Sequence, residues 1–478
     1  MMALFEILQS FLNTIFFIFG FVIVLSYIIL SLVSYFALRK YVKKSSFTVY
    51  DRLTSSPFAP GVSVIAPAYN ESKTIIENIR ALMSLYYQDY EVIIVNDGSK
   101  DDSLEKVIEH YKMVKVDYAV NYQLESKKIK GIYKSTDKSF SKLLLLDKEN
   151  GGKADALNAG INISNKDLFV VIDVDSIIEH DALQKLVKPF LEEKDEKILA
   201  TGSVIRVANS CEVDHGKIVN VRFPKQLLAQ FQTLEYNRAF LMGRMAWGKL
   251  NGLLLISGAI GMFDKACVIS AGGYNTQTVG EDMELIVRMR RYMEDKREKY
   301  KVIYIPDPLC WTEVPTKLKV LERQRNRWTR GTIETLTMHK KLFFNPKYGV
   351  MGMFGYPYWF FFEWLAPIVE LFGITYFLIL SIMGQANWPF FFLMLAFIYS
   401  FAISFSIWSI VYGGMSFNRY KSNSDFIRQI LTAIIEPIIY HPFIIYFAVK
   451  GNIDYFRGVK SWGKMDREGF QSKTKIKS

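Results

Sequence analysis

Three stretches of the chain are largely apolar and long enough to cross a lipid bilayer. Residues 11–38 contain no charged side chain, and residues 356–383 and 388–412 form two further stretches joined by the short segment GQAN. A helix of about 20 apolar residues spans the hydrocarbon core of a membrane. The pattern therefore predicts an N-terminal transmembrane helix and a C-terminal transmembrane hairpin.

A fourth apolar stretch, residues 430–449, is interrupted by polar residues and prolines. Glu436, Pro437, His441 and Pro442 lie inside it, and a lysine-rich and arginine-rich tail comes after it. A full crossing would place that tail outside the cell, against the tendency of basic segments to stay in the cytoplasm. We therefore expect a broken, re-entrant or interfacial segment, with the tail inside.

Between the first and second apolar stretches, short apolar runs alternate with segments of helical periodicity. Four runs read as strands: VSVIAP, EVIIV, KLLLLD and DLFVVID. The segment after the first run has helical spacing, with Asn70 or Ser72 available as N-cap. Such alternation predicts an open α/β sheet with parallel strands, which binds ligands at the carboxyl ends of its strands.

Charge suggests how these parts are arranged about the membrane. Four cations, Arg39, Lys40, Lys43 and Lys44, come directly after residues 11–38 and predict a cytoplasmic location for the region from residue 45 to about 345. The expected organisation is an anchor over residues 1–44, a cytoplasmic α/β domain over 45–345 with interfacial helices near 315–345, membrane or interfacial helices over 346–450, and a basic tail over 451–478. We expect a multi-pass protein of the plasma membrane.

The net charge bears on the binding partner of the protein, and the cysteine spacing bears on metal sites and disulfides. The net charge of +12 is expected to meet anionic lipid headgroups rather than nucleic acid, since basic and aromatic residues do not alternate as in single-strand-binding surfaces. Three cysteines, Cys211, Cys267 and Cys310, lack the spacing of a metal site or a disulfide framework. They are consistent with thiols of a reducing compartment.

The strongest local chemical signal is VVIDVDS, where a buried-type strand ends in two aspartates. Asp173 and Asp175 are two residues apart, so in a strand they project to the same side and repel each other. A divalent cation would neutralise them, and oxygen ligands favour Mg²⁺ or Mn²⁺. We predict a site for such a metal ion at these two aspartates.

Other motifs accompany this one in a fixed order. They are VSVIAPAYNES, VNDGSKD, NGGKADALNAG, TVGEDMEL and QRNRW. Together they resemble the processive family-two membrane glycosyltransferases, the group of cellulose, chitin, hyaluronan and poly-N-acetylglucosamine synthases, over about residues 60–335. The resemblance implies a GT-A-like open sheet domain inserted between transmembrane helices.

The resemblance also implies roles for individual residues. A nucleotide-sugar donor would be held by Pro67, Tyr69, Glu71, Asp97, Lys153, Asp173 and Arg327. Asp175 would be the direct ligand of the metal, and Asp173 would lie nearer the ribose or also at the metal. The acceptor would be bound by Ser257, Gly258, Gln324 and Trp328, where the indole suits the apolar face of a sugar. Asp282 would be the general base of a single inverting displacement, with Glu281 beside it at the catalytic centre. Carboxylates at Glu235 and Glu370 need a partner or cavity because they lie in or near apolar segments.

These implications predict a metal-dependent membrane enzyme that polymerises sugar from a UDP-sugar onto a growing β-linked glycan and passes the glycan through the membrane. An oligomer or an accessory membrane protein would complete the channel, since only three full spans are expected. Two alternatives stay open: transfer of a single sugar to a lipid or other membrane acceptor, and a polymer-export scaffold with a regulatory nucleotide-binding domain. A dinucleotide oxidoreductase is excluded, because APAYNES stands where GxGxxG would be needed.

Overall fold

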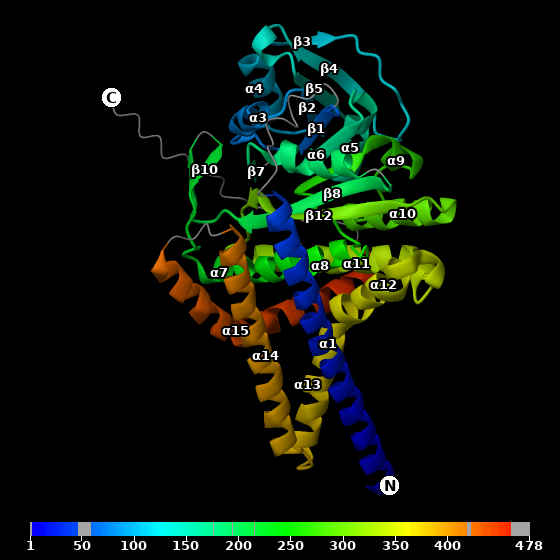
Figure 1. The fold of residues 1–478 in the computed structure, drawn as a ribbon, viewed down its shortest axis with the longest axis vertical. Coiled ribbons are helices and arrows are strands. Elements are labelled where there is room, and N and C mark those ends of the chain that lie inside the picture. The colour runs from blue at the N-terminus through cyan, green and yellow to red at the C-terminus, as the bar shows by residue number, and fades with distance from the viewer. Residues whose placement is uncertain are drawn as a thin grey trace.

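A sheet domain stands on a group of long helices (Figure 1). The computed structural model describes residues 2–45, 59–174, 176–193, 195–214, 216–417 and 422–459. Asp175, the predicted metal ligand, and the basic tail from residue 460 onwards lie outside these residues.

The centre of the domain is a ten-stranded sheet with the order β3-β4-β5-β2-β1-β6-β11-β8-β12-β7. Its strands are β1 Val62–Ala68, β2 Tyr90–Asn96, β3 Met113–Val116, β4 Ile129–Ser135, β5 Leu143–Lys148, β6 Leu168–Ile172, β7 Ile177–Ile178, β8 Lys197–Val207, β11 Ile260–Asp264 and β12 Tyr300–Thr312. A separate hairpin pairs β9 Glu212–Asp214 with β10 Lys217–Asn220.

The four apolar runs form the parallel core of the sheet, as their patterns predict. β5, β2, β1 and β6 are neighbours, and each adjacent pair is parallel. Nearly every residue of these strands is buried, which explains why their sequences are continuous apolar runs rather than alternating ones. The parallel order brings the carboxyl ends of the four strands to one edge, where Asn96, Asp97 and Asp173 lie.

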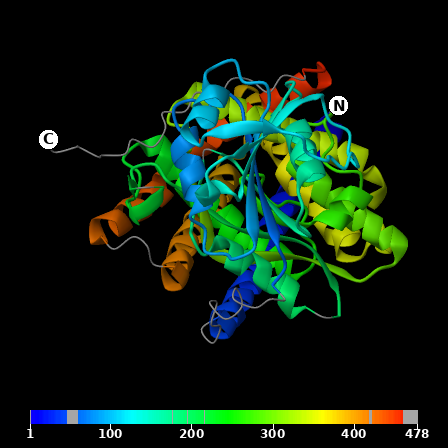
Figure 2. The same cartoon turned by 90° about the horizontal axis from the view of Figure 1, so that it is seen from above.

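Helices cover both faces of this sheet (Figure 2). They are α3 Ile75–Met83, α4 Ser103–His110, α5 Lys153–Ile163, α6 Ala182–Glu192, α9 Lys265–Ser270 and α10 Glu281–Lys296, with a short 3₁₀ turn at Lys138–Phe140. Helix α5 packs on β1 and β2 and is buried along almost its whole length. Its first residue, Lys153, is therefore held firmly at the edge where the strands end.

The helix after β1 begins later than its sequence predicts. Neither Asn70 nor Ser72 is its N-cap, because α3 begins at Ile75 and is preceded by Thr74. Asn70 has a positive φ of 58°, and its side-chain oxygen accepts a hydrogen bond from the backbone of Lys100 over 2.8 Å. The residues predicted as caps are thus used to join the loop after β1 to the loop after β2.

Below the sheet, amphipathic helices lead into the apolar ones. They are α7 Leu227–Tyr236, a π-helix at Asn237–Arg244, α8 Met245–Lys249, α11 Leu318–Met338, 3₁₀ turns at Lys340–Leu342 and Pro346–Tyr348, π-helical turns at Met351–Gly355 and Trp359–Leu365, and α12 Tyr356–Tyr358. The long apolar helices are α1 Met2–Ser45, α13 Ala366–Ile382, α14 Trp388–Phe417 and α15 Asn423–Phe456.

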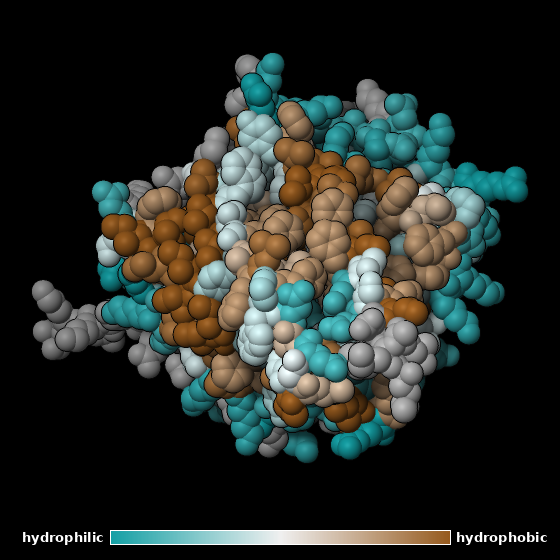
Figure 3. All heavy atoms as spheres, turned by 90° about the horizontal axis from the view of Figure 1, so that it is seen from below, coloured by the Kyte–Doolittle hydropathy of each residue, from teal (hydrophilic) through white to brown (hydrophobic). Residues whose placement is uncertain are grey.

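Among the described residues, four helical segments are long and apolar enough to cross a membrane: 7–45, 351–382, 388–414 and 423–456. Helices α1, α13 and α14 extend away from the sheet domain (Figure 1). Viewed from that end, hydrophobic side chains cover the middle of the molecule and hydrophilic ones its rim (Figure 3). The distribution suits insertion of these three helices in lipid.

The fourth segment is a single continuous helix, so of the three expected alternatives the broken segment is wrong, while a re-entrant or interfacial segment stays a prediction. Pro437 and Pro442 both lie inside α15, which runs from Asn423 to Phe456. The helix lies crosswise beneath the sheet domain, unlike α1, α13 and α14 (Figure 1). It packs against α7, α11, α13 and α14, and these neighbours hold a helix that two prolines would otherwise weaken.

Two pairs of charged or titratable side chains join neighbouring helices in this region. Arg238 donates to Glu436 of α15 over 3.0 and 3.2 Å and to Ser406 of α14 over 2.6 Å. Glu370 of α13 lies 2.7 Å from Nε2 of His441. The carboxylate at Glu370, which needs a partner in an apolar segment, therefore has one on a neighbouring helix.

Candidate active site

The loops after β1 and β2 lie together at the edge where the parallel strands end. The backbone of Asn70 donates to the Ser99 hydroxyl over 3.0 Å, and the backbone of Glu71 donates to the Ser103 hydroxyl over 2.9 Å. Tyr69 remains 44% exposed, unlike the buried strand that precedes it. The residues predicted to bind the donor, Pro67, Tyr69 and Glu71, thus lie at and just after the end of β1, where the Ala68 carbonyl accepts a hydrogen bond from the Asp97 amide over 3.0 Å.

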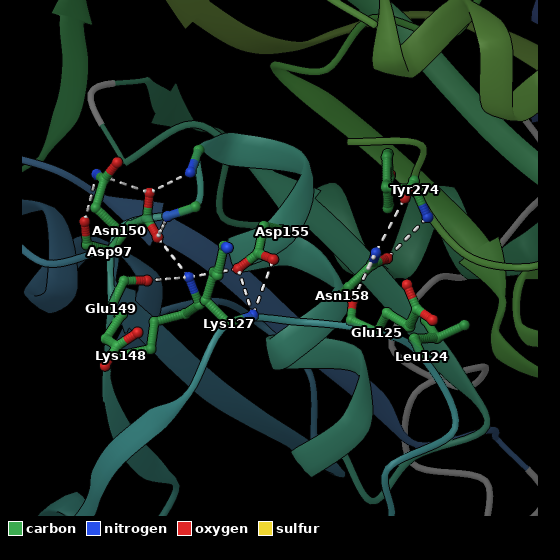
Figure 4. A network of polar contacts seen from close by, with 12 residues as sticks. Asp97, Leu124, Glu125, Lys127, Lys148, Glu149, Asn150, Asp155, Asn158 and Tyr274 are labelled. Carbon is green, nitrogen blue, oxygen red and sulfur yellow. Dashed lines mark hydrogen bonds and ion pairs between the residues drawn. The ribbon is translucent and has the colours of Figure 1, made fainter. Parts of the chain in front are cut away.

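The Asp97 carboxylate organises the loop that leads into α5 (Figure 4). Oδ1 accepts from Lys148 Nζ over 2.6 Å and from the Gly151 amide over 3.0 Å, and Oδ2 accepts from the Gly152 amide over 2.8 Å and from Asn150 Nδ2 over 3.2 Å. Four hydrogen bonds are the ordinary capacity of a carboxylate. A nucleotide could bind Asp97 only by replacing one of them, and the Asn150 contact is the longest.

Lys148 is a structural centre of the site that the motifs did not reveal. Its side chain is fully buried, and Nζ also lies 2.5 Å from Asp155 Oδ1 and donates to the Glu149 carbonyl over 2.6 Å. Asp155 in turn accepts from the Lys127 amide over 2.9 and 3.1 Å. The sequence contains one sign of this role: Lys148 comes directly after the apolar run KLLLLD. A lysine at the end of a buried strand needs a carboxylate partner to remain charged.

A second cluster of charges lies where α5, β6 and α10 meet. Lys153 Nζ pairs with Asp173 Oδ1 and donates to the Gly258 carbonyl over 3.2 Å. The Gly258 amide donates to Asp282 Oδ2 over 3.0 Å, and Asp282 Oδ1 accepts from the Met283 amide over 2.9 Å. A Cβ on Gly258 would lie 3.0 Å from Lys153 Nζ and 3.6 Å from Asp282 Oδ2, so the glycine lets both charged groups approach.

The charged groups of this cluster shift one another's pKa values. Burial raises the pKa of Glu281 to about 7, the charge of Lys153 opposes that rise, and the neighbouring Asp282 carboxylate adds to it. Burial disfavours the ammonium of Lys153, but the carboxylates of Asp173, Glu281 and Asp282 outweigh it and raise the pKa of this lysine. Lys153 is therefore a charged ammonium surrounded by acidic groups.

Two glycines bring the helix that carries Asp282 into direct contact with α11. A Cβ on Gly280 would lie 2.7 Å from the Cα of Gly331, so neither residue can carry a side chain without moving the backbone. The loop before α10 is also held by Glu334 of α11, which accepts from the Thr278 hydroxyl over 2.6 Å and from the Val279 amide over 2.9 Å. The position of Asp282 is thus set by α11.

Behind Asp282, a buried carboxylate joins α10 to the end of α11. Glu284, 2% exposed, accepts from Arg288 Nε over 2.8 Å and lies 3.2 Å from His339 Nε2. Burial opposes its ionisation, yet the hydrogen bonds from His339 and Arg288 outweigh burial and lower the pKa of Glu284 to about 2. The ionised form stabilises the folded domain.

Substitution Glu284→Gln should lower stability at neutral pH by about 3 kcal/mol, because a carboxyl whose folded pKa is depressed contributes stability above its unfolded pKa. The contribution is lost as pH falls from about 4.5 to about 2, so the wild type should destabilise across that window while the variant changes less. Thermal unfolding of detergent-solubilised protein against pH measures this. Glu298→Gln, at an exposed position, is the control, and parallel pH curves for wild type and Glu284→Gln would contradict the assignment.

The QRNRW motif lies on α11 and is anchored beneath the sheet. Arg325 donates to Glu235 over 2.7 and 2.9 Å and to the Tyr440 hydroxyl over 3.3 Å, while its guanidinium lies 4.2 Å from the centre of the Trp328 ring. The indole is 39% exposed. Gln324 lies one helical turn before Trp328. Its buried Oε1 accepts no hydrogen bond from the described residues, so this oxygen could accept one from a ligand.

Comparison with known proteins fits this arrangement. Residues 60–331, more than half of the chain, match the family described as "Glycosyltransferase like family 2". The chain belongs to glycosyltransferase family 2. The chain is 29% identical over 278 residues to the poly-β-1,6-N-acetyl-D-glucosamine synthase of Staphylococcus aureus strain COL, and 27% identical over 276 residues to that of Staphylococcus epidermidis.

These alignments cover 58% of the chain, and the chain spans 55% of the length of each of the two synthases. Among solved structures, a mannosyltransferase from Pyrobaculum calidifontis in complex with GDP-mannose and Mn²⁺ has a TM-score of 0.51 and 15% sequence identity. The alignment covers 91% of this chain and 99% of that one. At this identity the likeness concerns the fold, which is the mixed α/β sheet domain with apolar helices that the sequence predicts.

The family-2 domain brings most of the predicted site residues to one edge of the sheet. Lys153, Asp173, Gly258 and Asp282 are linked by hydrogen bonds, and Arg327 acts on Glu281 through its charge. Other predicted residues lie around them: Pro67, Tyr69, Glu71 and Asp97 at the ends of β1 and β2, Ser257 beside Gly258, and Gln324 and Trp328 on α11. Contacts of Asp175 fall outside the described residues.

Within the described parts of the chain, no three acidic, histidine or cysteine side chains are grouped so that they could hold a metal ion. Asp173, with 28% of its side chain exposed, already receives a cation in the form of the Lys153 ammonium. Mg²⁺ is commonly held by one or two carboxylates together with substrate phosphates. Asp173 has the chemistry of such a ligand, but a divalent cation there would have to share the carboxylate with the Lys153 ammonium or displace it.

Proposed function

We propose that this chain is a membrane-embedded inverting glycosyltransferase that polymerises sugar from a UDP-sugar into a β-linked polysaccharide. The observation that carries the proposal is the convergence of Lys153, Asp173 and Asp282 around Gly258, at the edge of the sheet where parallel strands end. The names of the staphylococcal synthases point to UDP-N-acetylglucosamine as the first donor to test.

The donor would bind across the ends of β1, β2 and β6. Pro67, Tyr69 and Glu71 would flank the nucleoside. Asp97 would either position the loop of residues 150–152 against the nucleotide or give up its hydrogen bond from Asn150 and bind the nucleotide directly. Lys153 and Arg327 are cations suited to the diphosphate, Arg327 as a bidentate donor. The similar fold of a mannosyltransferase that was solved with GDP-mannose and Mn²⁺ supports a nucleotide sugar and a divalent cation as ligands.

We propose that Mg²⁺ or Mn²⁺ binds at the end of β6, with Asp175 as the direct protein ligand and Asp173 beside it, nearer the nucleotide or also in contact with the metal. When bound, the metal would stabilise the negative charge that the leaving nucleoside diphosphate gains. Asp282 would accept the proton of the attacking hydroxyl, since its carboxylate is held by the amides of Gly258 and Met283 at the centre of the cluster. A single base is consistent with one displacement and therefore with inversion at the sugar.

The acceptor glycan would lie between this cluster and α11. Trp328 offers an exposed indole for the apolar face of a sugar, and the buried Gln324 oxygen offers an acceptor for a hydroxyl. Ser257 and Gly258 would form the opposite wall. Helices α1, α13 and α14 would cross the plasma membrane with the sheet domain in the cytoplasm, and α11 and α15 would lie at the cytoplasmic lipid surface.

The deciding experiment incubates purified full-length protein with a panel of UDP-sugars and Mn²⁺ or Mg²⁺. UDP release and a polymer whose length grows with time are expected from one donor, and linkage analysis of that polymer identifies the product. UDP release with a single added sugar on a lipid acceptor would replace polymerisation by single transfer. No UDP release from any donor would contradict the enzyme assignment.

Substitution Trp328→Ala should lower polymer elongation by about tenfold while lowering hydrolysis of the donor much less. Stacking on an aromatic side chain contributes about 1–3 kcal/mol to binding in comparable contacts, and we expect a similar contribution to binding of the acceptor sugar. The indole would not contact the donor. Elongation and donor hydrolysis are measured in parallel. Trp388→Ala, at an exposed tryptophan that begins α14, is the control, and an equal loss of both reactions in Trp328→Ala would argue against an acceptor platform.

A further inference from the structure

Lys153 occupies the centre of the acidic cluster. Its ammonium pairs with Asp173 Oδ1 and donates to the Gly258 carbonyl over 3.2 Å, and that same glycine donates to Asp282 over 3.0 Å. Only 19% of the Lys153 side chain is exposed. One ammonium therefore contacts both Asp173, one of the two carboxylates predicted at the metal site, and the loop that holds the predicted base.

The position of this ammonium conflicts with a divalent cation on Asp173. A like charge close to the same carboxylate disfavours binding of the metal, and the effect is strong because the site is largely shielded from water. The described residues offer no other grouped ligands for a metal ion. Protein ligands alone would thus bind the metal weakly as long as Lys153 remains on Asp173.

A nucleoside diphosphate changes this balance. Its phosphate oxygens carry negative charge that can receive the ammonium and can also complete the coordination of a metal. The lysine lies at the first position of α5, directly after Gly152, which has a φ of 88°. A Cβ on Gly152 would meet no atom of the described residues within 4 Å. The Cβ position of Gly152, the residue directly before Lys153, is therefore open.

We propose that Lys153 holds the place of the divalent cation at Asp173 until the nucleoside diphosphate arrives, so that metal binds tightly only together with the nucleotide. This inference rests on the proposed function. In the free protein the ammonium offsets the charge of the Asp173 carboxylate. On donor binding it transfers from Asp173 to the diphosphate, and Asp173 becomes available to the metal.

The test measures binding of Mn²⁺ by electron paramagnetic resonance of the free ion, using full-length protein in detergent, with and without UDP. Wild type is expected to bind Mn²⁺ at least about tenfold more tightly when UDP is present, because UDP removes the competing ammonium. Lys153→Met and Lys153→Gln are expected to bind Mn²⁺ without UDP at least about tenfold more tightly than wild type. Adding Asp173→Asn to Lys153→Met should abolish the gain.

The matched control is Lys197→Met, which removes a lysine from another lysine–aspartate pair, Lys197 with Asp264, at 3.2 Å and remote from the cluster. It should bind Mn²⁺ as wild type does. Equal Mn²⁺ affinity without UDP in wild type and both Lys153 variants, while UDP still promotes binding, would overturn the inference and leave the proposed function standing. Absence of Mn²⁺ binding in every protein, with UDP present, would overturn both.

Discussion

Substitution Asp282→Asn should reduce sugar transfer by about 10²–10⁴-fold while leaving affinity for UDP almost unchanged. The amide keeps the shape of the side chain but cannot take a proton from the acceptor hydroxyl. Asp282 accepts hydrogen bonds from the Gly258 and Met283 amides, whereas Lys153 pairs with Asp173, so the donor side should remain intact. UDP release under turnover and UDP binding by calorimetry measure the two effects separately.

The control is Asp264→Asn, which also changes an aspartate near a helix start, because Asp264 accepts from the Cys267 amide over 2.6 Å at the N-terminus of α9. It should transfer sugar at a rate close to that of wild type. A large loss of UDP affinity in Asp282→Asn would show that Asp282 serves the donor, and the assignment of the base would then be wrong.

The second large effect is a loss of folding stability, which we expect from the substitution Lys148→Met. The substitution leaves Asp97 and Asp155 buried without their cation, and removal of one partner from a buried ion pair costs about 3–5 kcal/mol. The loop that Asp97 holds should open as well, since its Gly151 and Gly152 amides depend on that carboxylate. Hydrogen exchange of the peptide covering residues 149–153, monitored by mass spectrometry, should accelerate strongly, and thermal unfolding should begin at lower temperature.

Lys166→Met is the matched control, because Lys166 pairs with Asp89, whose side chain is 57% exposed. Exposed ion pairs contribute about 0–1 kcal/mol, so this variant should melt close to wild type. Unchanged hydrogen exchange at residues 149–153 in Lys148→Met would mean that the loop is held by contacts other than those through Asp97.

The parts of the fold that depend on local pattern could be predicted from the sequence. Four continuous apolar runs become the parallel core, and Lys153 begins a helix, because burial on both faces and helix periodicity are properties of neighbouring residues. The apolar stretches near the termini likewise become long helices. These signals need no knowledge of the elements that pack against them.

The features that could not be predicted depend on partners distant in the sequence. Asn70 has the chemistry of a helix cap, but the loop after β2 competes for its side chain, so α3 starts at Ile75. Prolines suggest a break in the last apolar segment, yet packing from several helices keeps α15 continuous. Lys148 resembles a surface lysine until β2 and α5 bring two carboxylates to it.

The contact between Gly280 and Gly331 has a mechanical consequence. Helix α15 presses on α11 at Gly451, where a Cβ would lie 2.8 Å from the Thr329 side chain, and α11 presses on the start of α10 through the two glycines. The first contact involves only the short, branched side chain of Thr329 and the second involves backbone alone, so neither contains a long side chain that could change its conformation to absorb a displacement. A tilt of α15 caused by a change in lipid thickness or lateral pressure would therefore move the Asp282 carboxylate, and turnover should respond to the physical state of the bilayer.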